Sequence, residues 1–268
     1  MGNLISPSRR RSRQTRSCFK EFILHRRSRQ RGLTRLEVVA VLAALGLLAC
    51  VALPALANTR NRSERVGCMS NLRQVGQALH AWASSHGDRV PWLTPWTEEG
   101  TYVPAGGTPL PIWYGLQNQA YFQYSWVSNE LVSPKYLVCP ADSSKVVARN
   151  WGSGDPTGGF RHGNFRDNAV SYTISLHAWP ERTEWILSGD RNFGYDALVS
   201  SCSTHIMPAR EIRPATTIAG WQGTIHGTNG NILLYDGRVE QVDTPGLRRV
   251  FLKYLSGDND AEHFIHQY

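Results

Sequence analysis

Two kinds of hydrophobic pattern follow one another in the first third of the chain. Residues 38–57 form an apolar run, VVAVLAALGLLACVALPALA, in which none of the 20 positions carries a charge. A helix of that length spans about 30 Å, the thickness of a bilayer core, and soluble helices rarely stay apolar on every face. The run therefore predicts a transmembrane helix. The alternatives are a buried helix of a soluble protein and a cleaved secretory signal, whose apolar region is usually only about 7–15 residues long.

A different pattern begins after the polar stretch at residues 58–65. Apolar side chains then recur every three or four positions, as expected for one face of a helix. The positions are Met69, Leu72, Val75, Leu79 and Trp82. This spacing predicts an amphipathic helix that packs one stripe against a globular domain. We expect the helix to continue to about His86, to end at Gly87, and to bend at Pro54, which removes one backbone hydrogen bond.

Past residue 87 the chain reads as short strands separated by long loops that are rich in Gly and Pro. Asp236-Gly237 lies between two apolar-containing runs and predicts a two-residue hairpin, whose turn positions favour positive φ. Thr244-Pro245 before LRRVFLKYL predicts a short helix with a threonine cap and proline at its first position. The predicted strands are 169–178, 184–187, 231–235 and 238–242.

These elements predict an α+β fold, in which a long N-terminal helix packs on a small antiparallel-sheet head with long loops. The expected organisation is a leader, a transmembrane helix, an amphipathic helix that continues into the head, and a globular α+β domain. The corresponding ranges are 1–32, 33–57, 58–87 and 88–268.

The positive charge of the chain is concentrated in the leader. Of 29 Lys and Arg residues, 10 lie in residues 1–32 against the single acid Glu21, which gives this segment a net charge of +9. The remainder has 19 basic and 20 acidic residues, so its net charge is −1. The head therefore lacks the basic surplus that nucleic-acid binding requires. Because positive charge stays cytoplasmic, everything after the apolar run is expected across the membrane.

Glu37 is unusual because it is a carboxylate at the entrance to the apolar run, where an unpaired charge is costly. A snorkelling interfacial acid is one interpretation. Gly32-Leu33-Thr34-Arg35-Leu36-Glu37 followed by an apolar helix also resembles the type IV prepilin signal, and Pro54 falls where that family commonly has a helix-kinking proline. The sequence departs from the usual Phe at the first mature position, here Leu33, and from an apolar third position, here Arg35.

The resemblance implies that a prepilin peptidase and N-methyltransferase cuts after Gly32 and methylates the new N-terminus at Leu33. It also implies that Glu37 pairs with the N-terminal amine of a neighbouring subunit and so sets the register of assembly. In an apolar bundle such a pair neutralises two charges that would each be expensive alone.

Three further blocks are similar to a large bacterial group of pseudopilin-like proteins. The first is the helical C-x-x-N-L-x-Q-[IV]-G-x-A-L block, the second is the Cys-Pro-x-Asp turn at 139–142, and the third is the C-terminal H-X9-DG motif. The motif residues in this chain are Cys68, Asn71, Leu72, Gln74, Gly76, His226, Asp236 and Gly237.

The cysteines offer a possible covalent link between the long helix and the head, in addition to the packing of the apolar stripe. Cys18 lies in the leader and Cys50 in the apolar run, whereas Cys68, Cys139 and Cys202 face an oxidising compartment if the topology holds. Cys68–Cys139 is the preferred disulfide, and three unpaired buried thiols are the alternative. No Cys-x-x-Cys is present, which argues against zinc and thioredoxin chemistry.

Candidate chemistry in the head is sparse. His226 and Asp236 invite a catalytic or metal interpretation, but ten residues of extended strand span about 33 Å, and turn chemistry explains the aspartate. The acidic and amide side chains of Asp190, Asn192 and Asp196 are the oxygens that calcium would use, although they lack EF-hand spacing. No other cofactor is expected.

The sequence is compatible with three functions. The favoured function is a non-enzymatic one, a pseudopilin-like structural subunit of a type II secretion or type IV pilus-like assembly in the bacterial inner membrane. Its N-terminus is expected in the cytoplasm and its head in the periplasm or outside, with other pilin-like subunits as partners.

The second function is a membrane-anchored extracytoplasmic module that binds a glycan or a protein. Loop tryptophans would stack on sugar rings, although packing is the usual role of tryptophan. They are Trp92, Trp96, Trp113, Trp126 and Trp151. The third function is an anchored hydrolase, disfavoured because no Gly-x-Ser-x-Gly motif is present. Its histidines would be His162, His177, His205 and His226.

Overall fold

A computed structural model describes the chain in five stretches, and contacts within the chain divide it between Ala52 and Leu53. The two units are described separately below. The described stretches are residues 34–93, 119–199, 209–213, 219–255 and 262–265.

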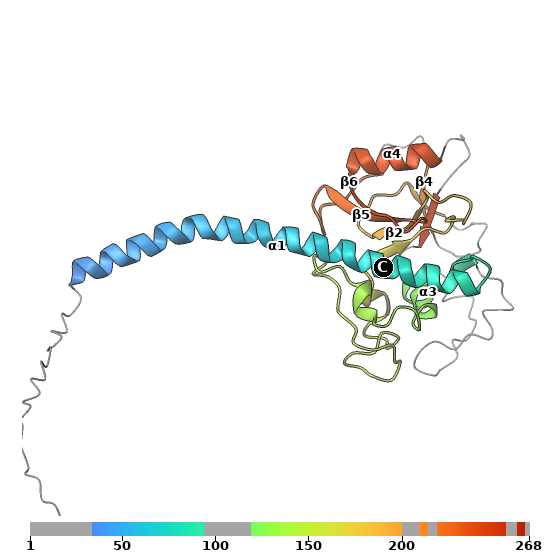
Figure 1. The fold of residues 1–268 in the computed structure, drawn as a ribbon, viewed down its shortest axis with the longest axis horizontal. Helices are drawn as coiled ribbons and strands as arrows, with labels where there is room; N and C mark the ends of the chain where they lie inside the picture. The colour runs from blue at the N-terminus through green and yellow to red at the C-terminus, as the bar shows by residue number, and fades with distance from the viewer. Residues whose placement is uncertain (1–33, 94–118, 200–208, 214–218, 256–261, 266–268) are drawn as a thin grey trace, which may run out of the picture. The chain divides into compact units, whose positions relative to one another are not determined.

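One helix dominates the N-terminal part of the described chain (Figure 1). Helix α1 runs from Arg35 to Ser85 over 51 residues and continues through Pro54 without a break, so the bend expected there stays a prediction. Gly87 follows with φ of +64°, the left-handed conformation that ends many helices. The predicted end of the helix is therefore confirmed.

The first part of α1 carries the apolar surface predicted from the sequence. Arg35–Leu53 is a 19-residue stretch long and apolar enough to cross a membrane, and none of it is buried within the structure. Among the described residues it is the one helix with this property. It fits either a single membrane span or a signal sequence.

The head contains two antiparallel sheets. The first has four strands in the order β1-β2-β5-β6, and the second has three strands in the order β3-β4-β7. The first sheet consists of β1 (Tyr172–Ile174), β2 (Ile186–Asp190), β5 (Asn229–Leu234) and β6 (Val239–Asp243). The second consists of β3 (Ala197–Val199), β4 (Ala209–Ile212) and β7 (Glu262–Ile265).

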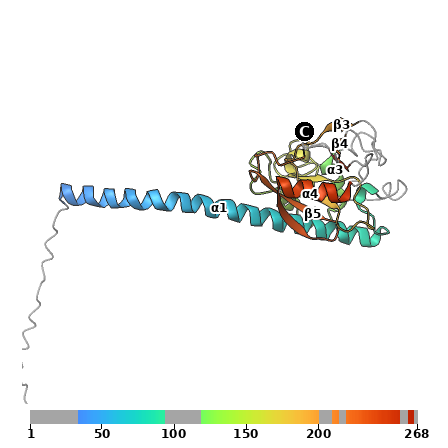
Figure 2. The same cartoon turned by 90° about the horizontal axis from the view of Figure 1, so that it is seen from above.

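The four-stranded sheet has a hydrophobic core on each face, because neighbouring strand residues point to opposite sides. Leu187 and Leu233 join the core that contains the stripe of α1, whereas Ile232 joins the core of α4 (Thr244–Tyr254). Figure 1 accordingly shows α1 and α4 on opposite sides of β2, β5 and β6. In Figure 2, where the head is seen from above, α4 lies in front.

The amphipathic stripe on α1 is confirmed. Leu72, Val75 and Leu79 are fully buried, Trp82 is nearly so, and Met69 packs against the same core. The same core also takes buried residues from α3 (Ala120–Trp126) and from three short 3₁₀ turns. These turns are η1 (Pro91–Leu93), η2 (Pro134–Leu137) and η3 (Arg166–Ala169).

Two local predictions were wrong in detail. The β5–β6 hairpin closes through three residues, Tyr235 to Gly237, because Leu234 donates to the carbonyl of Arg238, and only Gly237 has positive φ. This is a type I turn followed by a left-handed glycine. The cap of α4 is Asp243, whose carboxylate accepts from the backbone N–H of Gly246. The hydroxyl of Thr244 accepts instead from the N–H of Trp221.

The observed mixture of helices and antiparallel sheet confirms the α+β class. Each predicted strand overlaps one strand of the four-stranded sheet, but the sequence did not predict β3, β4 or β7. The reason is that β3 and β4 have only three and four residues, too few for an alternating pattern to stand out.

Candidate functional site

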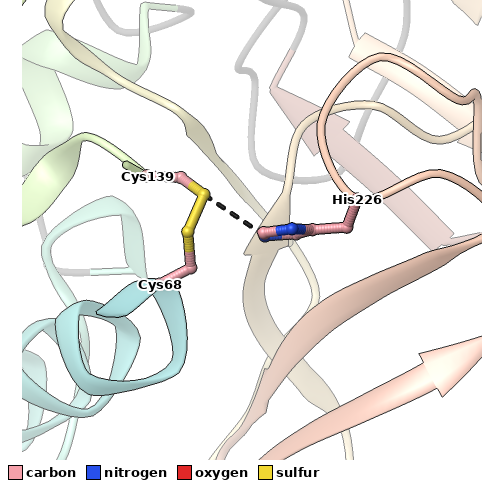
Figure 3. A group of neighbouring side chains, drawn as sticks. All are labelled: Cys68, Cys139 and His226. Atoms are coloured by element: carbon pink, nitrogen blue, oxygen red, sulfur yellow. Dashed lines mark hydrogen bonds between the residues drawn. A yellow bond between two sulfur atoms is a disulfide. The ribbon is translucent and has the colours of Figure 1, made fainter. Parts of the chain in front are cut away.

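The three motif blocks of the sequence meet at one place. Cys68 comes from α1, Cys139 from the turn after η2, and His226 from the loop before β5 (Figure 3). All three side chains are buried, and their sulfur and nitrogen atoms lie within 4.8 Å of one another. Segments far apart in the sequence therefore build one side-chain cluster, which we call the Cys–His cluster.

The two cysteines form a disulfide. It joins residues 71 positions apart, with a Cα–Cα distance of 4.8 Å. Two hydrogen bonds reinforce it: Asn71 Nδ2 donates to the carbonyl of Val138 over 2.8 Å, and the hydroxyl of Tyr172 donates to the carbonyl of Cys68 over 3.3 Å. The amphipathic half of α1 is thus tied to the turn that contains Cys139 by the disulfide and by Asn71, and to β1 by Tyr172.

His226 lies between the disulfide and a buried acid. Its Nε2 is 3.3 Å from Sγ of Cys139 and 3.7 Å from Oδ2 of Asp190. Burial lowers the pKa of His226 to about 4, and the nearby charge of Arg65 acts in the same direction. Burial raises the pKa of Asp190 to about 7, against the hydrogen bonds that it accepts from Asn231. The imidazole is therefore neutral near pH 7, so the pair is not a full ion pair.

A second polar group lies beside this cluster and belongs to the Cys-Pro-x-Asp turn. Arg191 donates through Nε and Nη2 to the two carboxylate oxygens of Asp142, at 2.9 and 3.1 Å, and Ser144 donates to the same carboxylate. Burial alone would raise the pKa of Asp142, but these hydrogen bonds outweigh it and hold the pKa below its usual value. This two-point contact fixes the turn against the end of β2.

The remaining helical motif residues differ in role. Leu72 is fully buried in the core, and Gly76 faces β5, where an added Cβ would lie 2.9 Å from Cδ1 of Leu233. Glycine at this position therefore allows α1 to approach the sheet closely. Gln74 is exposed.

The histidine and the Asp-Gly pair of the H-X9-DG motif lie in different parts of the head. His226 belongs to the Cys–His cluster, whereas Asp236 accepts from the backbone N–H and Nε of Arg238 within the hairpin turn. Gly237 has φ of +85° and lies against the ring of His80 on α1. The prediction that the aspartate serves the turn fits these contacts.

The oxygen ligands considered for calcium have separate partners. Asp190 accepts from Asn231, Asn192 donates to the carbonyl of Gln222, and Asp196 accepts from the N–H of Arg213. Among the described residues, the only group of three or more His, Cys, Asp or Glu side chains with metal-ligand spacing is Cys68, Cys139 and His226. The geometry therefore does not favour calcium at the three expected residues.

The tryptophans proposed for sugar stacking do not offer open faces where the structure describes them. Trp92, Trp126 and Trp151 are all buried, with Trp126 at 2% exposure. Trp96 and Trp113 lie outside the described residues, as do His205, Cys18 and Cys202. The described tryptophans thus contribute to packing, the more usual role.

The histidines considered for hydrolysis reveal a cluster that the sequence did not suggest. His177 Nε2 lies 3.4 Å from Nδ1 of His263, whose Nε2 lies 3.1 Å from a carboxylate oxygen of Glu211. Nearby, burial raises the pKa of Glu262, which accepts from the hydroxyl of Ser175 over 2.7 Å. These residues come from three distant segments, so no spacing could have indicated them. His162 accepts locally from Asn164.

Glu37 is engaged within its own chain. The backbone N–H and hydroxyl of Thr34 both donate to Oε2 of Glu37, and the Glu37 N–H donates to the hydroxyl of Thr34. This reciprocal arrangement is a capping box at the start of α1. The spacing of Thr34 and Glu37 matches the S/T-x-x-E motif of such a box. Gly32 and Leu33, the expected processing residues, lie outside the described residues.

Comparison with known proteins gives no name for this arrangement. No family model matches the chain, and neither the curated proteins nor the solved structures contain a match.

Proposed function

We propose that this chain is a pseudopilin-like structural subunit of a type II secretion or type IV pilus-like assembly. A prepilin peptidase would remove the leader after Gly32 and methylate Leu33. The observation that carries the proposal is the single helix α1, which is exposed and apolar over Arg35–Leu53 and contributes core residues beyond Cys68. One end of the helix therefore needs lipid or other subunits to cover it, and the other end belongs to a folded head.

The proposed mechanism is assembly. Apolar helices of neighbouring subunits would bundle around Arg35–Leu53 within the bilayer and then in the filament. After cleavage the new ammonium at Leu33 would pair with Glu37 of a neighbour, which neutralises both charges in an apolar setting. The basic leader favours a cytoplasmic N-terminus, and the disulfide fits a head in an oxidising compartment.

Processing is the first test. The full chain is expressed in bacteria with and without a prepilin peptidase, and the membrane-bound protein is analysed by N-terminal sequencing and mass spectrometry. We expect a start at methylated Leu33 only when the peptidase is present, and a retained leader in Gly32→Val. Gly2→Val is the matched control and is expected to be processed normally. A full-length chain in the presence of active peptidase would refute the proposal.

The role of Glu37 needs a test that separates register from capping. Glu37→Gln keeps the side-chain length and can still cap, but loses the negative charge. Thr34→Ala breaks the capping box and keeps that charge. We expect Glu37→Gln to insert into the membrane but to abolish cross-linking between neighbouring subunits, whereas Thr34→Ala still assembles. If Thr34→Ala fails and Glu37→Gln assembles, Glu37 serves only the local cap.

A further inference from the structure

The Cys–His cluster places a histidine beside the disulfide, although a structural disulfide needs no such neighbour. In Figure 3 the imidazole of His226 points directly at the disulfide, with Nε2 3.3 Å from Sγ of Cys139. The same nitrogen lies 3.7 Å from Oδ2 of Asp190. Two sulfurs and one imidazole nitrogen therefore lie within 4.8 Å of one another, with a buried carboxylate next to the imidazole, and cysteine, histidine and aspartate are the side chains that typically bind zinc.

Asp190 gives a second, independent indication of a ligand. Its side chain is fully buried, and its Oδ1 has no hydrogen-bond partner among the residues that the structure describes. The other oxygen, Oδ2, accepts from the backbone N–H and the side-chain amide of Asn231, at 2.7 and 3.1 Å. A buried carboxylate oxygen without a partner is costly, and a bound cation would satisfy it. Asn231 would meanwhile hold the carboxylate in place, as residues behind metal ligands do.

We propose that reduction of the Cys68–Cys139 disulfide converts this cluster into a binding site for a thiophilic divalent cation such as Zn²⁺. Cys68, Cys139 and His226 would be ligands, and Asp190 the fourth. Tetrahedral zinc with bonds of about 2.0–2.3 Å places its ligand atoms about 3.3–3.8 Å apart. The distance of 3.3 Å between Nε2 of His226 and Sγ of Cys139 already matches this separation. The carboxylate of Asp190 comes within 3.7 Å of the same nitrogen through Oδ2, so that its free oxygen Oδ1 is close enough to turn toward a cation there.

The oxidised and metal-bound forms exclude each other, because a disulfide sulfur is not a thiolate ligand. A dithiol reductant would deliver two electrons and two protons to the disulfide, giving two thiols while its own sulfurs become a disulfide. Zn²⁺ would then displace the two thiol protons. Two thiolates, the Asp190 carboxylate and Zn²⁺ sum to one negative charge. Arg65, whose Nη2 lies 3.5 Å from the carbonyl of His226, supplies positive charge nearby.

A cavity of about 230 Å³ lies next to the cluster on the side of His226, and it is lined by His226, Ala141, Glu64 and Arg65 among others. In either state the cluster would tie α1 to the turn at Cys139, by a covalent bond when oxidised and by a metal when reduced. The sequence did not indicate this site, because its ligands are spread from residue 68 to residue 226 and lack zinc-motif spacing.

The test uses the full chain in detergent micelles with Cys18, Cys50 and Cys202 replaced by Ser, so that only the two cluster cysteines remain. The protein is reduced with dithiothreitol, desalted without oxygen and titrated with Co²⁺. We expect one equivalent to give a thiolate-to-cobalt charge-transfer band and the visible bands of tetrahedral Co²⁺, both displaced by Zn²⁺. The oxidised protein is expected to give neither.

Single replacements identify the other ligands. His226→Gln and Asp190→Asn are each expected to weaken Co²⁺ binding at least tenfold, whereas His162→Gln, a histidine outside the cluster, leaves it unchanged. If the reduced chain gives no charge-transfer band, or if both ligand variants bind as tightly as the parent, the proposal is wrong.

A second measurement needs no ligand variant and so does not depend on whether variants fold. Alkylation of Cys68 and Cys139 by iodoacetamide is followed by mass spectrometry in the reduced chain, with and without Zn²⁺. We expect Zn²⁺ to slow alkylation of both cysteines at least tenfold. Equal rates with and without Zn²⁺ would overturn the proposal.

Discussion

The two halves of α1 have the same secondary structure for different reasons. In Arg35–Leu53 no residue is buried, and leucines such as Leu47 remain 72% exposed. In the stretch from Cys68 to Ala83, by contrast, one face is buried completely and the other faces solvent. The first half is a helix whose apolar surface is left uncovered by the residues that the structure describes. The second half is stabilised by its own tertiary contacts, and this difference can be tested residue by residue.

The largest expected effect separates the cysteines of the two halves. Replacing Cys68 and Cys139 together by Ala removes a cross-link between residues 71 positions apart. In the chain-entropy model this lowers the free energy of unfolding by about 4 kcal/mol. Cys50→Ser changes a free, exposed thiol in the first half, and it should change that free energy by less than about 0.5 kcal/mol.

The measurement is urea unfolding of the full chain in detergent under non-reducing conditions, followed by the tryptophan fluorescence of the head. If the double variant unfolds at the same urea concentration as the parent, the disulfide does not stabilise the second half and the comparison fails.

A smaller effect concerns pH, which should act on the head through the buried pair beside the second half. The folded pKa of His226, about 4, lies below its ordinary value of 6.5, so the unfolded chain binds more protons between these values. His226 therefore adds stability as pH rises from 4 to 6.5. The folded pKa of Asp190, about 7, lies above its ordinary value of 3.8, so the folded chain binds more protons between these values. Asp190 therefore lowers the free energy of unfolding as pH rises over the same interval. The two effects oppose each other.

Single variants should reveal these opposed slopes. In Asp190→Asn only the histidine remains, and stability should rise by about 2 kcal/mol between pH 4.5 and 6 relative to the parent. In His226→Gln only the aspartate remains, and stability should fall relative to the parent by a similar amount. Arg65, Glu64 and Asp142 are the same in both variants, so their contributions cancel in the difference. Urea unfolding of the oxidised protein in EDTA at each pH measures the free energy of unfolding. If the two variants shift its pH dependence in the same direction relative to the parent, the pKa directions given for His226 and Asp190 are wrong.

The smallest expected effect compares two glycines of the same helix. Gly46 in the first half has nothing within 4 Å of an added Cβ, whereas at Gly76 that Cβ would lie 2.9 Å from Leu233. Replacing glycine by alanine within a helix stabilises it by about 1 kcal/mol, whereas overpacking a core destabilises it by about 1–3 kcal/mol. Gly76→Ala should therefore destabilise the head by about 1 kcal/mol.

Gly46→Ala should leave the stability of the head unchanged and preserve or increase helicity. Circular dichroism reports the helicity, and urea unfolding reports the stability. A Gly76→Ala variant as stable as the parent would mean that Leu233 shifts without cost, so the close contact between α1 and β5 is not tight.

The sequence predicted local structure correctly where residues close together in the chain decide that structure. The helix end at Gly87 depends on φ of one residue, and the stripe from Met69 to Trp82 depends on the 3.6-residue repeat. The cap of α4 shows the limit of this reasoning. Asp243 and Thr244 are both good capping residues, and the partner that Thr244 finds at Trp221 in another segment decided between them.

The sequence by itself determined the apolar stretch, the amphipathic stripe and the α+β class, because each follows from periodicity or composition. It preferred the Cys68–Cys139 pair but left unpaired thiols open, and the tertiary structure decided for the disulfide. Only the tertiary structure decided that His226 lies beside Cys139 and Asp190 rather than Asp236, and that His263 lies beside Glu211. Such contacts join segments many residues apart. Their partners are chosen by how the sheets pack, which no spacing along the chain records.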